Sequence, residues 1–397
     1  MGALTGLKIL DFSTLLPGPM GTMMLADLGA DVISVTGPGK PDLMNGFPPI
    51  IDELGSSASS AWLGRNKRSI ELNLKKPEAV EAVKKMIMDY DIVIEQFRPG
   101  VMAKLGLGYE DLKAVNPGII YCSISGFGQN GPLVQKADHD LNYMALSGNL
   151  VFMDGKEPQT VNIPNFHLAD ITGGGYVAPI AILAAVYHRM QTGEGQYIDL
   201  GMLDGIMAFN CIEGLGVLAA RKYPEAKGWH NRHISGLAIG PNVAPYQTKD
   251  GKYMMVSSME PKFLANLCET LGFPEWANGK AFYKEPETVR AALTEKFKEK
   301  TRDEWTEIFM NVDACVEPIL DIVEAWDSEQ LKAREMSVEV PLSIAADKTI
   351  EQIANPIKFS ATPVEYKHTG YPVGYNTQEV LSELGFSDEV IADISAQ

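Results

Sequence analysis

Leu7-Lys8-Ile9-Leu10-Asp11-Phe12 opens an alternation of strands and helices that decides the fold. This apolar run predicts a buried strand, and Pro17-Gly18-Pro19 then begins an apolar helix that extends to about Leu28. Further strands are predicted over residues 30–35, 91–95, 118–125 and 195–200, and further helices over residues 79–89 and 170–190. Short strands separated by helices of about 10–15 residues predict right-handed βαβ units and a parallel sheet covered on both faces.

The length of 397 residues is sufficient for two domains. Residues 1–220 and 333–397 are predicted to form a large α/β domain with a parallel sheet. Residues 221–242 are rich in Gly, Pro, His and Arg, and this composition predicts a linker. Residues 243–332 are predicted to form a smaller α+β domain and its return linker, because a hairpin around Lys249-Asp250-Gly251 precedes amphipathic helices.

The overall composition limits the cellular compartments and the binding partners that we expect for this protein. The formal net charge of −17 disfavours binding to nucleic acid and to anionic membranes. The N-terminus lacks a basic region followed by a sustained apolar stretch, and the apolar segment 177–186 is shorter than the roughly 20 residues of a membrane span. The cysteines are widely spaced without a CxxC pair, which predicts reduced thiols in a cytoplasmic protein and no metal site.

Basic residues gather in two segments of the first half of the chain. Residues 65–75 hold four cations in eleven positions, and residues 96–104 add Arg98 and Lys104. Both segments are expected at the carboxyl edge of the sheet, where α/β folds bind ligands. Spacing alone is equally compatible with a solvated surface and structural salt bridges. In so acidic a chain, the two segments favour a ligand that carries phosphate.

The sequence does not favour a nucleotide cofactor. Pro17-Gly18-Pro19-Met20-Gly21 follows the first predicted strand, and it is not a G-x-G-x-x-G fingerprint. The chain also lacks a P-loop motif. Proline has no N–H that could be offered to a pyrophosphate. NAD and ATP are therefore not expected as ligands.

The middle of the chain holds two candidates for acid–base catalysis. His139 stands in the segment 136–143, and Asp170 follows at the start of the predicted apolar helix. Weak bases on both sides of one carbon could remove a proton and return it. Each residue has a structural alternative, since His139 could be an ordinary hydrogen-bonding residue and Asp170 an N-cap. The other histidines form no metal-like spacing and are expected to be structural or exposed: His167, His188, His230, His233 and His368.

Six segments of the chain have a distinctive order and spacing. They are Gly6-Leu7-Lys8-Ile9-Leu10-Asp11, Leu28-Gly29-Ala30-Asp31-Val32, Arg65-Asn66-Lys67-Arg68-Ser69, Phe97-Arg98-Pro99-Gly100, Ile124-Ser125-Gly126-Phe127-Gly128-Gln129-Asn130-Gly131-Pro132 and Gly193-Glu194-Gly195-Gln196. With them the chain resembles the family III CoA transferases (the CaiB/BaiF family) over nearly its whole length. The resemblance implies a Rossmann-like large domain that binds CoA, a smaller domain, and a homodimer of two interlocked chains.

The same resemblance implies which ligand the basic segments hold. It is an acyl-CoA, and no cofactor is expected beyond coenzyme A as part of that substrate. The implied contacts are Arg65, Lys67, Leu72, Asn73, Lys75, Phe97, Arg98, Lys104, Lys136, Asp140 and Tyr143.

Two chemistries occur within that family. Its transferases use an aspartate at the position of Asp170 as a nucleophile, through anhydride and thioester intermediates. The α-methylacyl-CoA racemase branch keeps this aspartate and adds a histidine, which His139 matches in a His-Asp-x-x-Tyr pattern. Glu260 matches a glutamate that supports this histidine, and residues 313–318 also resemble the racemase branch.

The resulting hypothesis is that the α-carbon of a 2-methylacyl-CoA is inverted by two-base 1,1-proton transfer through an enolate. His139 and Asp170 would be the bases, and Glu260 would orient the imidazole. Donors to the enolate are expected from the start of the Asp170 helix, where Gly173-Gly174-Gly175 allows close approach, and from a backbone N–H near Asp140. The helix N-terminus would lower the pKa of Asp170 and burial would raise it, and the sequence does not decide between them.

Two alternatives stay open at this point. A family III CoA transferase would move CoA between carboxylic acids through a covalent Asp170 intermediate, and a non-catalytic homologue would bind acyl-CoA without turnover. The acyl group is not specified, because the expected pocket walls, residues 45–60 and 149–165, have no shape that the sequence reveals. Near Thr36 the family commonly has a phosphate-binding arginine that this chain lacks, and Lys40 is the candidate replacement.

Overall fold

The computed structural model describes residues 1–39, 42–150, 163–225 and 240–396. The chain divides into two compact units, of which the first comprises Met1–His230 and Glu335–Gln397 and the second Asn231–Arg334. The sequence predicts the small domain over residues 243–332, all of which fall within the second unit. The predicted linker, residues 221–242, lies mostly outside the described residues, and its first residues belong to helix α10 (Cys211–Lys222).

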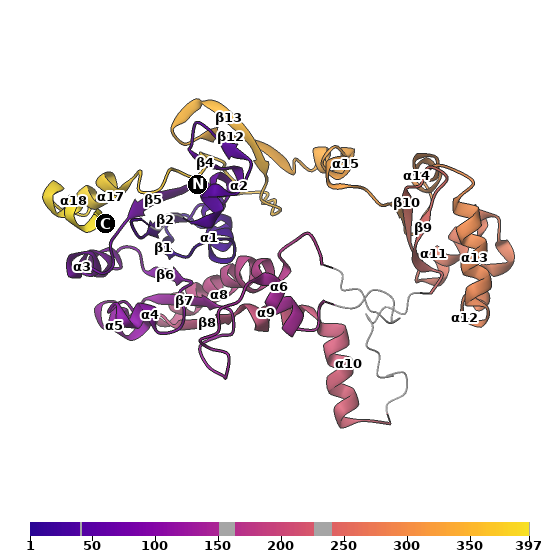
Figure 1. Cartoon of the computed structure of the whole chain (residues 1–397), viewed down its shortest axis with the longest axis horizontal. Coiled ribbons are helices and arrows are strands. Elements are labelled where there is room, and N and C mark those ends of the chain that lie inside the picture. Colours follow the sequence, from indigo (N-terminus) through magenta and orange to yellow (C-terminus); the bar gives the residue numbers. More distant parts are fainter. Residues whose placement is uncertain (40–41, 151–162, 226–239, 397) are drawn as a thin grey trace. The chain divides into compact units, whose positions relative to one another are not determined.

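The first unit is built on a six-stranded sheet in which all neighbouring strands are parallel. The strands follow the order β5-β2-β1-β6-β7-β8 (Figure 1). Their bounds are β1 Lys8–Phe12, β2 Asp31–Thr36, β5 Lys67–Glu71, β6 Ile92–Glu95, β7 Ile120–Ser125 and β8 Tyr197–Gly201. The predicted α/β fold with a parallel sheet is confirmed. The sequence does not predict the edge strand β5, because charged residues interrupt its apolar pattern.

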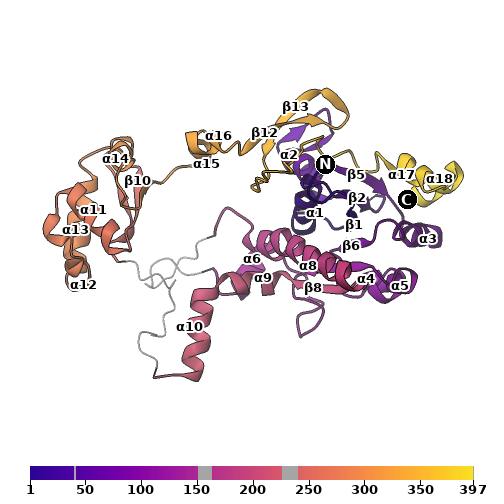
Figure 2. The same cartoon turned by 180° about the vertical axis from the view of Figure 1, so that it is seen from behind.

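Helices cover both faces of this sheet. Successive side chains of a strand point to opposite faces, and since both sets are apolar here, both faces must be buried. On one face, isoleucines of β1, β6 and β7 form a buried core with α1 (Pro17–Asp27) and α8 (Val177–Thr192). Figure 2 shows α8 alongside β7 and β8, which it contacts. On the other face, the core includes α3 (Pro77–Met86) and α5 (Tyr109–Val115). Both faces are therefore buried, as expected for a parallel sheet.

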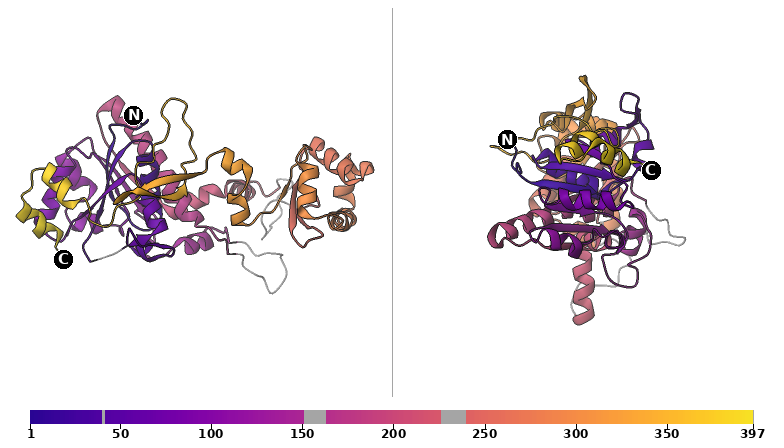
Figure 3. Two further views of the ribbon diagram at one scale, coloured as in Figure 1. Left: turned by 90° about the horizontal axis from the view of Figure 1, so that it is seen from above. Right: turned by 90° about the vertical axis from the view of Figure 1, so that its left-hand side faces the viewer.

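The C-terminal residues cover the free edge of β5. The backbone N–H of Ser69 donates a hydrogen bond to the Asn376 side chain at 3.0 Å. Helix α17 (Thr377–Glu383) contacts β5, and α18 (Asp388–Ser395) contacts α3. Figure 3 shows these two helices in yellow beside the purple α3. An edge strand whose N–H groups are occupied in this way is protected from pairing with other chains.

One continuous helical run leads to the site. It consists of α7 (Leu168–Asp170), the π-helical turn η2 (Ile171–Tyr176) and α8, and it begins before the predicted residue 170. A β-carbon on Gly174 would lie 2.3 Å from the β-carbon of Pro17 in α1. One on Gly173 would lie 2.6 Å from an α-carbon of α9 (Met202–Phe209). Glycine therefore allows three helices to pack closely here.

The length of this run corrects one sequence expectation. Leu168–Thr192 is long and apolar enough to cross a membrane by length and composition alone, although 56% of that window is buried inside the protein. Met202–Phe209 and Gly214–Lys222 pass the same test only as a pair bent by 81°. The predicted segment 177–186 is too short to span a membrane, but the helix extends beyond it at both ends. Buried core helices are apolar in the same way.

The second unit contains the predicted hairpin. Strands β9 (Val243–Gln247) and β10 (Tyr253–Ser257) pair in antiparallel register, and β11 (Val316–Pro318) adds a third strand. Its helices are α11 Pro261–Leu271, η3 Pro274–Trp276, α12 Lys280–Lys284, α13 Pro286–Phe297, α14 Arg302–Phe309, α15 Ile322–Trp326 and α16 Glu329–Ala333. This unit has its own buried core around Phe297 and Trp305.

Short elements complete the first unit. They are η1 Leu43–Gly46, β3 Ile50–Ile51, β4 Ser56–Ser57, α2 Ala58–Leu63, α4 Val101–Lys104, α6 Asp140–Leu146, β12 Ser337–Leu342 and β13 Ala345–Ile353. Of these, α6 contacts α7 and α9 and so brings the His139 segment to the helical run that carries Asp170.

Candidate active site

A cavity of about 170 Å³ opens at the carboxyl ends of the central strands β6 and β7. Gln96, Phe97 and Arg98 follow β6, and Ser125 ends β7. The other lining residues are Leu15, Pro17, Pro99, Gly126, Val134, Lys136, Ala137, Asp138, His139, Tyr143, Asp170 and Met202. Open parallel sheets bind their ligands at this edge. The fold therefore puts a cavity where the sequence analysis expects a ligand.

His139 and Asp170, which come from different elements, both line this cavity. His139 is the residue before α6, and its backbone is extended, with φ −126°. Its N–H is held by the side chain of Asn142 at 3.2 Å. The imidazole itself makes no capping bond to the helix and is exposed. The structure thus brings the two predicted bases to one site, with the ring of His139 available to a ligand.

Asp170 lies inside the helical run and not at its N-cap. Its backbone is helical, its side chain caps no helix, and its N–H donates to Asp140 Oδ1 at 3.0 Å. The structural alternative in which Asp170 is an N-cap is therefore wrong. Burial, and secondly the negative charge of Asp140, raise the pKa of Asp170 to about 7. Burial thus prevails over any effect of the helix N-terminus, which answers the question that the sequence left open.

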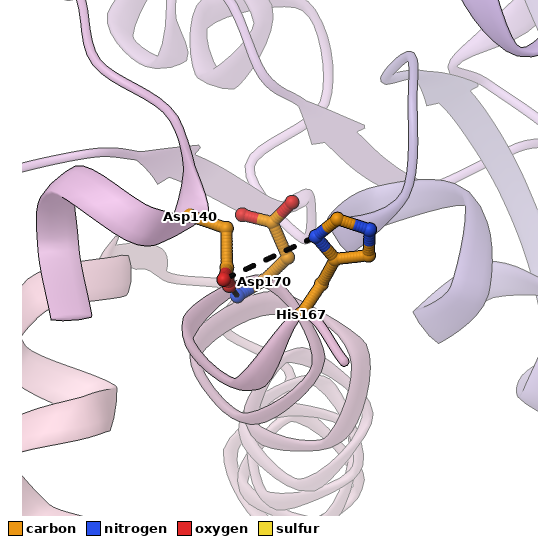
Figure 4. A group of neighbouring side chains, drawn as sticks. All are labelled: Asp140, His167 and Asp170. Carbon is orange, nitrogen blue, oxygen red and sulfur yellow. Dashed lines mark hydrogen bonds and ion pairs between the residues drawn. The ribbon is translucent and has the colours of Figure 1, made fainter. Parts of the chain in front are cut away.

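Asp140 joins the two halves of the site. It is the first residue of α6, it is buried, and one carboxylate oxygen accepts the Asp170 N–H. Figure 4 shows His167 next to this pair, and its Nδ1 lies 4.0 Å from Asp140 Oδ2. The sequence analysis expects His167 to be structural or exposed, and it is exposed but also close to the site. Its position three residues before Asp170 in a helical segment is the signal that could have indicated this.

The expected enolate donors change in one respect. Two N–H groups near the start of the helical run are engaged, because that of Asp170 donates to Asp140 Oδ1 and that of Ile171 donates to the His167 carbonyl, both at 3.0 Å. Gly173-Gly174-Gly175 is buried against neighbouring helices, so its predicted role of approaching the ligand is wrong. The N–H of Asp140 stays a candidate, because the first N–H groups of a helix have no partner within it.

Two other predicted contacts, Lys136 and Tyr143, also line the cavity. The ammonium group of Lys136 lies 2.9 Å from the carboxylate of Asp138. The hydroxyl of Tyr143 donates to the carbonyl of Asp138 at 2.7 Å. Burial raises the pKa of Tyr143 to about 12, so its hydroxyl stays protonated at neutral pH. Both side chains hold the loop that precedes His139.

The two first cations of the basic segment 65–75 are not available to a ligand. Arg65 is fully buried and makes two bonds to the carboxylate of Asp27, at 2.6 and 2.9 Å. Lys67 is buried too, and its ammonium group contacts Asp11 at 3.2 Å and the carbonyl of Pro19 at 2.8 Å. Their predicted role as phosphate contacts is therefore wrong. Each instead neutralises an acid that the sheet and α1 bury.

The rest of that segment is partly engaged as well. Arg68 pairs with Asp31 at 3.3 Å and with Glu383 at 3.1 Å. The side chain of Leu72 belongs to the buried core, so it cannot contact a ligand as predicted. Asn73 donates to the backbone of Ala396 at 3.1 Å. The structure thus explains most of this segment by folding and not by binding.

The cations that could hold phosphate are Lys75, Arg98 and Lys104. All three are exposed, and none forms an ion pair within the residues that the structure describes. Phe97 is half-buried and lines the cavity beside Arg98. Lys40, the candidate replacement for the missing arginine, lies outside the described residues, as does most of the expected pocket wall 149–165.

Glu260 belongs to the second unit. It is exposed, it precedes α11, and its side chain does not cap that helix. This position is also compatible with that of an ordinary acid at a helix start. Its support of His139 stays a prediction.

The sequence was compared with family models, with curated proteins and with solved structures. The model of CoA-transferase family III matches residues 4–377. The chain belongs to this family. The human protein named alpha-methylacyl-CoA racemase is 33% identical over 397 residues, which cover 99% of this chain and 96% of that protein. The succinate–glutarate CoA-transferase of Agrobacterium fabrum is 34% identical over 397 residues, with 96% and 95% covered.

Solved structures agree with the family assignment. A CaiB/BaiF family protein from Brucella suis has a TM-score of 0.78 and 30% sequence identity, with 96% of this chain and 99% of that chain covered. Racemases and CoA transferases occur among the relatives of this family member at similar identities. Overall similarity therefore does not distinguish the two chemistries, and the site residues must carry that argument.

Proposed function

We propose that this protein inverts the α-carbon of 2-methylacyl-CoA thioesters. The observation that carries the proposal is that an imidazole and a carboxyl group with a pKa of about 7, His139 and Asp170, line one cavity. A carboxyl group with this pKa can both accept and donate a proton at neutral pH, as an inversion in both directions requires. A CoA transferase needs the carboxylate alone.

The reaction consists of two proton transfers at one carbon. One base removes the α-proton, the electron pair moves into the thioester to give an enolate, and the second group returns a proton to the opposite face. The N–H of Asp140 is the proposed donor to the enolate oxygen, because a fixed dipole in a dry site stabilises the charge that develops. His139 and Asp170 exchange roles for the two enantiomers.

The exposed cations after β6 are the proposed binding site of the CoA phosphates. Arg98 lines the cavity, and Lys104 ends the short helix α4 that follows it. Guanidinium groups bind phosphate through paired hydrogen bonds, and an ammonium group adds a mobile charge. No cofactor beyond coenzyme A is proposed, and the compartment proposed is the cytoplasm.

We further propose a homodimer. Large apolar side chains are exposed on α8 and on α10, including Ile180, Tyr187 and Met190 on the first and Ile212 and Leu215 on the second. Exposed apolar surface of this kind commonly marks a protein interface. Analytical ultracentrifugation checks the proposal, and a monomer at micromolar concentration would contradict it.

The decisive experiment measures exchange at the α-carbon. A 2-methylacyl-CoA is incubated with the protein in deuterated water, without any free carboxylic acid. We expect deuterium at the α-carbon and loss of optical activity. Both His139→Ala and Asp170→Asn should slow exchange about 100-fold or more, because each removes an acid–base group.

CoA transfer is the second candidate, because transferases occur among relatives at identities of 34% and 30%. In that reaction the Asp170 carboxylate attacks an acyl-CoA and expels CoA thiolate, which gives a mixed anhydride. The thiolate then attacks the aspartyl carbonyl, which releases the first acid and forms an aspartyl thioester. A second acid attacks this thioester, and the thiolate that it expels takes over the second acyl group and restores the Asp170 carboxylate. Strict dependence on an acceptor acid, with no α-exchange, would replace the racemase proposal by this one. His139→Ala would then retain activity, whereas Asp170→Asn would lose it.

A further inference from the structure

Only one of the two carboxylate oxygens of Asp140 has a hydrogen-bond partner within the described residues. One oxygen accepts the N–H of Asp170, whereas Oδ2 is buried and has no hydrogen-bond partner within the residues that the structure describes. The residue is 4% exposed. Burying a charged oxygen without a partner is costly. A cation close to Oδ2 would therefore stabilise the ionised form of Asp140.

His167 is placed to supply this cation. Its Nδ1 lies 4.0 Å from Oδ2 of Asp140, and its side chain is 65% exposed, which leaves the ring free to turn (Figure 4). The residue stands immediately before α7, and its carbonyl accepts the N–H of Ile171 at 3.0 Å. Its backbone is thus fixed while its ring is not. A proton on this ring would create an ion pair with Asp140.

The other charged or titratable groups around the site are Arg98, Lys136, Asp138, His139, Tyr143 and Asp204. In the part of the chain that the structure describes, none of them forms a hydrogen bond or an ion pair with Oδ2 of Asp140. Lys136 pairs with Asp138, and the Tyr143 hydroxyl donates to the carbonyl of Asp138. Asp204, on α9, lies against the backbone of Gly201. Within the described residues, the ring nitrogen that lies 4.0 Å from the unpartnered Oδ2 of Asp140 is therefore Nδ1 of His167.

We propose that protonated His167 is a positioning residue, which pairs with Asp140 and thereby favours the ionised form of Asp170. Asp140 is the link, because it holds the backbone of Asp170 through one oxygen and faces His167 with the other. The proposal deepens the proposed function and rests on it only for the effect on turnover. The effect on the protonation of Asp170 does not depend on which reaction the family member catalyses.

The direction of the effect follows from the charges. The negative charge of Asp140 is one cause of the raised pKa of Asp170. A positive charge on His167 offsets that negative charge, and so it lowers the pKa of Asp170. Removing the imidazole should therefore raise the pKa of Asp170 further. An opposite charge a few ångströms away changes a pKa by roughly one unit or more, and transmission through Asp140 puts the expectation at about one unit.

The first experiment reads the carboxyl group directly. The full-length protein is labelled with ¹³C at aspartate carboxyl groups, and the signal of Asp170 is assigned by its loss in Asp170→Asn. We expect the midpoint of its pH titration to rise by about one unit in His167→Gln. His167→Lys, which supplies a permanent cation, should bring the midpoint back to or below that of the wild type. His188→Gln removes an exposed histidine of α8 and is the matched control.

An equal midpoint in the wild type and His167→Gln would overturn the proposal, and so would an equal shift in His188→Gln. Failure of the proposed racemisation would leave this measurement intact, so the two failures are distinguishable.

The second experiment measures the pH profile of α-proton exchange. For the enantiomer from which Asp170 removes the proton, the acid limb of kcat/KM should move up by about one pH unit in His167→Gln. The alkaline limb should move little, because it reports loss of the proton that the second group returns. A residue that only maintains the fold would lower kcat/KM at every pH without moving the acid limb, and that result would contradict the proposal.

Discussion

The two basic segments of the chain look alike in sequence and have different roles in the structure. In the segment 65–75, Arg65 and Lys67 are buried and paired with Asp27 and Asp11. In the segment 96–104, Arg98 and Lys104 are exposed and unpaired within the described residues. The segment 65–75 contains the edge strand β5, with Lys67 at its amino end, whereas the segment 96–104 follows the carboxyl end of β6. The difference shows that a cluster of cations indicates a ligand only where the fold leaves no buried acid to neutralise.

The largest expected effect is on the stability of the fold, and it concerns the buried ion pair of Arg65 and Asp27. Arg65→Ala should lower the free energy of unfolding by about 3–5 kcal/mol, because Asp27 would stay buried without its partner. Denaturant unfolding monitored by circular dichroism measures the loss. A folded variant of wild-type stability with weaker acyl-CoA binding would reverse our assignment of Arg65.

Glu95 is a buried acid that, unlike Asp27 and Asp11, has no cation beside it within the described residues. Glu95 ends β6, and its neighbours there are the Ser123 hydroxyl and the N–H of Phe97. Burial raises its pKa to about 7, so the protonated form favours folding. This contribution to stability is complete below the ordinary pKa of glutamate and is lost as the pH rises through 7.

Glu95→Gln should therefore unfold less readily than the wild type at pH 8, by about 2 kcal/mol, and should show little difference at pH 4. Thermal unfolding across this pH range measures the effect, with the exposed Glu307→Gln as the control. A wild-type stability that does not fall between pH 5 and pH 8 would contradict the burial argument.

At the exposed end of the comparison, the expected effect is on binding. Arg98→Ala should raise KM for an acyl-CoA about tenfold and leave the unfolding free energy within about 0.5 kcal/mol of the wild type. Arg334→Ala, another exposed arginine, is the control. If both variants bind alike, the phosphates lie elsewhere.

The smallest effect is expected at Lys104. Its ammonium group is an exposed point charge, so Lys104→Ala should raise KM about two- to threefold at low salt and hardly at all at high salt. Steady-state kinetics at two ionic strengths measure the difference. An effect that does not depend on salt would point to packing and not to charge.

The sequence predicts the fold well where the spacing of apolar residues clearly distinguishes strands from helices. The strands β1, β2, β6 and β7 are short apolar runs between helices, and their order in the chain requires a parallel sheet. It fails at β5, because Lys67 and Glu71 interrupt the apolar pattern of a strand that has only one neighbour. The helix at Asp170 is predicted in type, but its start is missed, since the cap signal of an aspartate is also compatible with a position inside the helix.

The candidate site was predicted in part. His139 and Asp170 were found because their local patterns are distinctive, and they do line one cavity. The roles of Arg65 and Lys67 were missed because their partners, Asp27 and Asp11, are distant in the sequence and become neighbours only in the fold. The sequence does not single out His167 by composition, and the signal for its position is its spacing of three residues before Asp170 in a helical segment.

The covering of β5 by the C-terminal residues has a consequence for biosynthesis. The second unit is an insertion, so the residues that bond to this strand leave the ribosome only after that unit has been made. At a synthesis rate of about 5–20 residues per second, the edge strand β5 of a nascent chain therefore stays uncovered for roughly a quarter of a minute or longer. During that interval the unpaired N–H groups of β5 stay open to pairing with other chains.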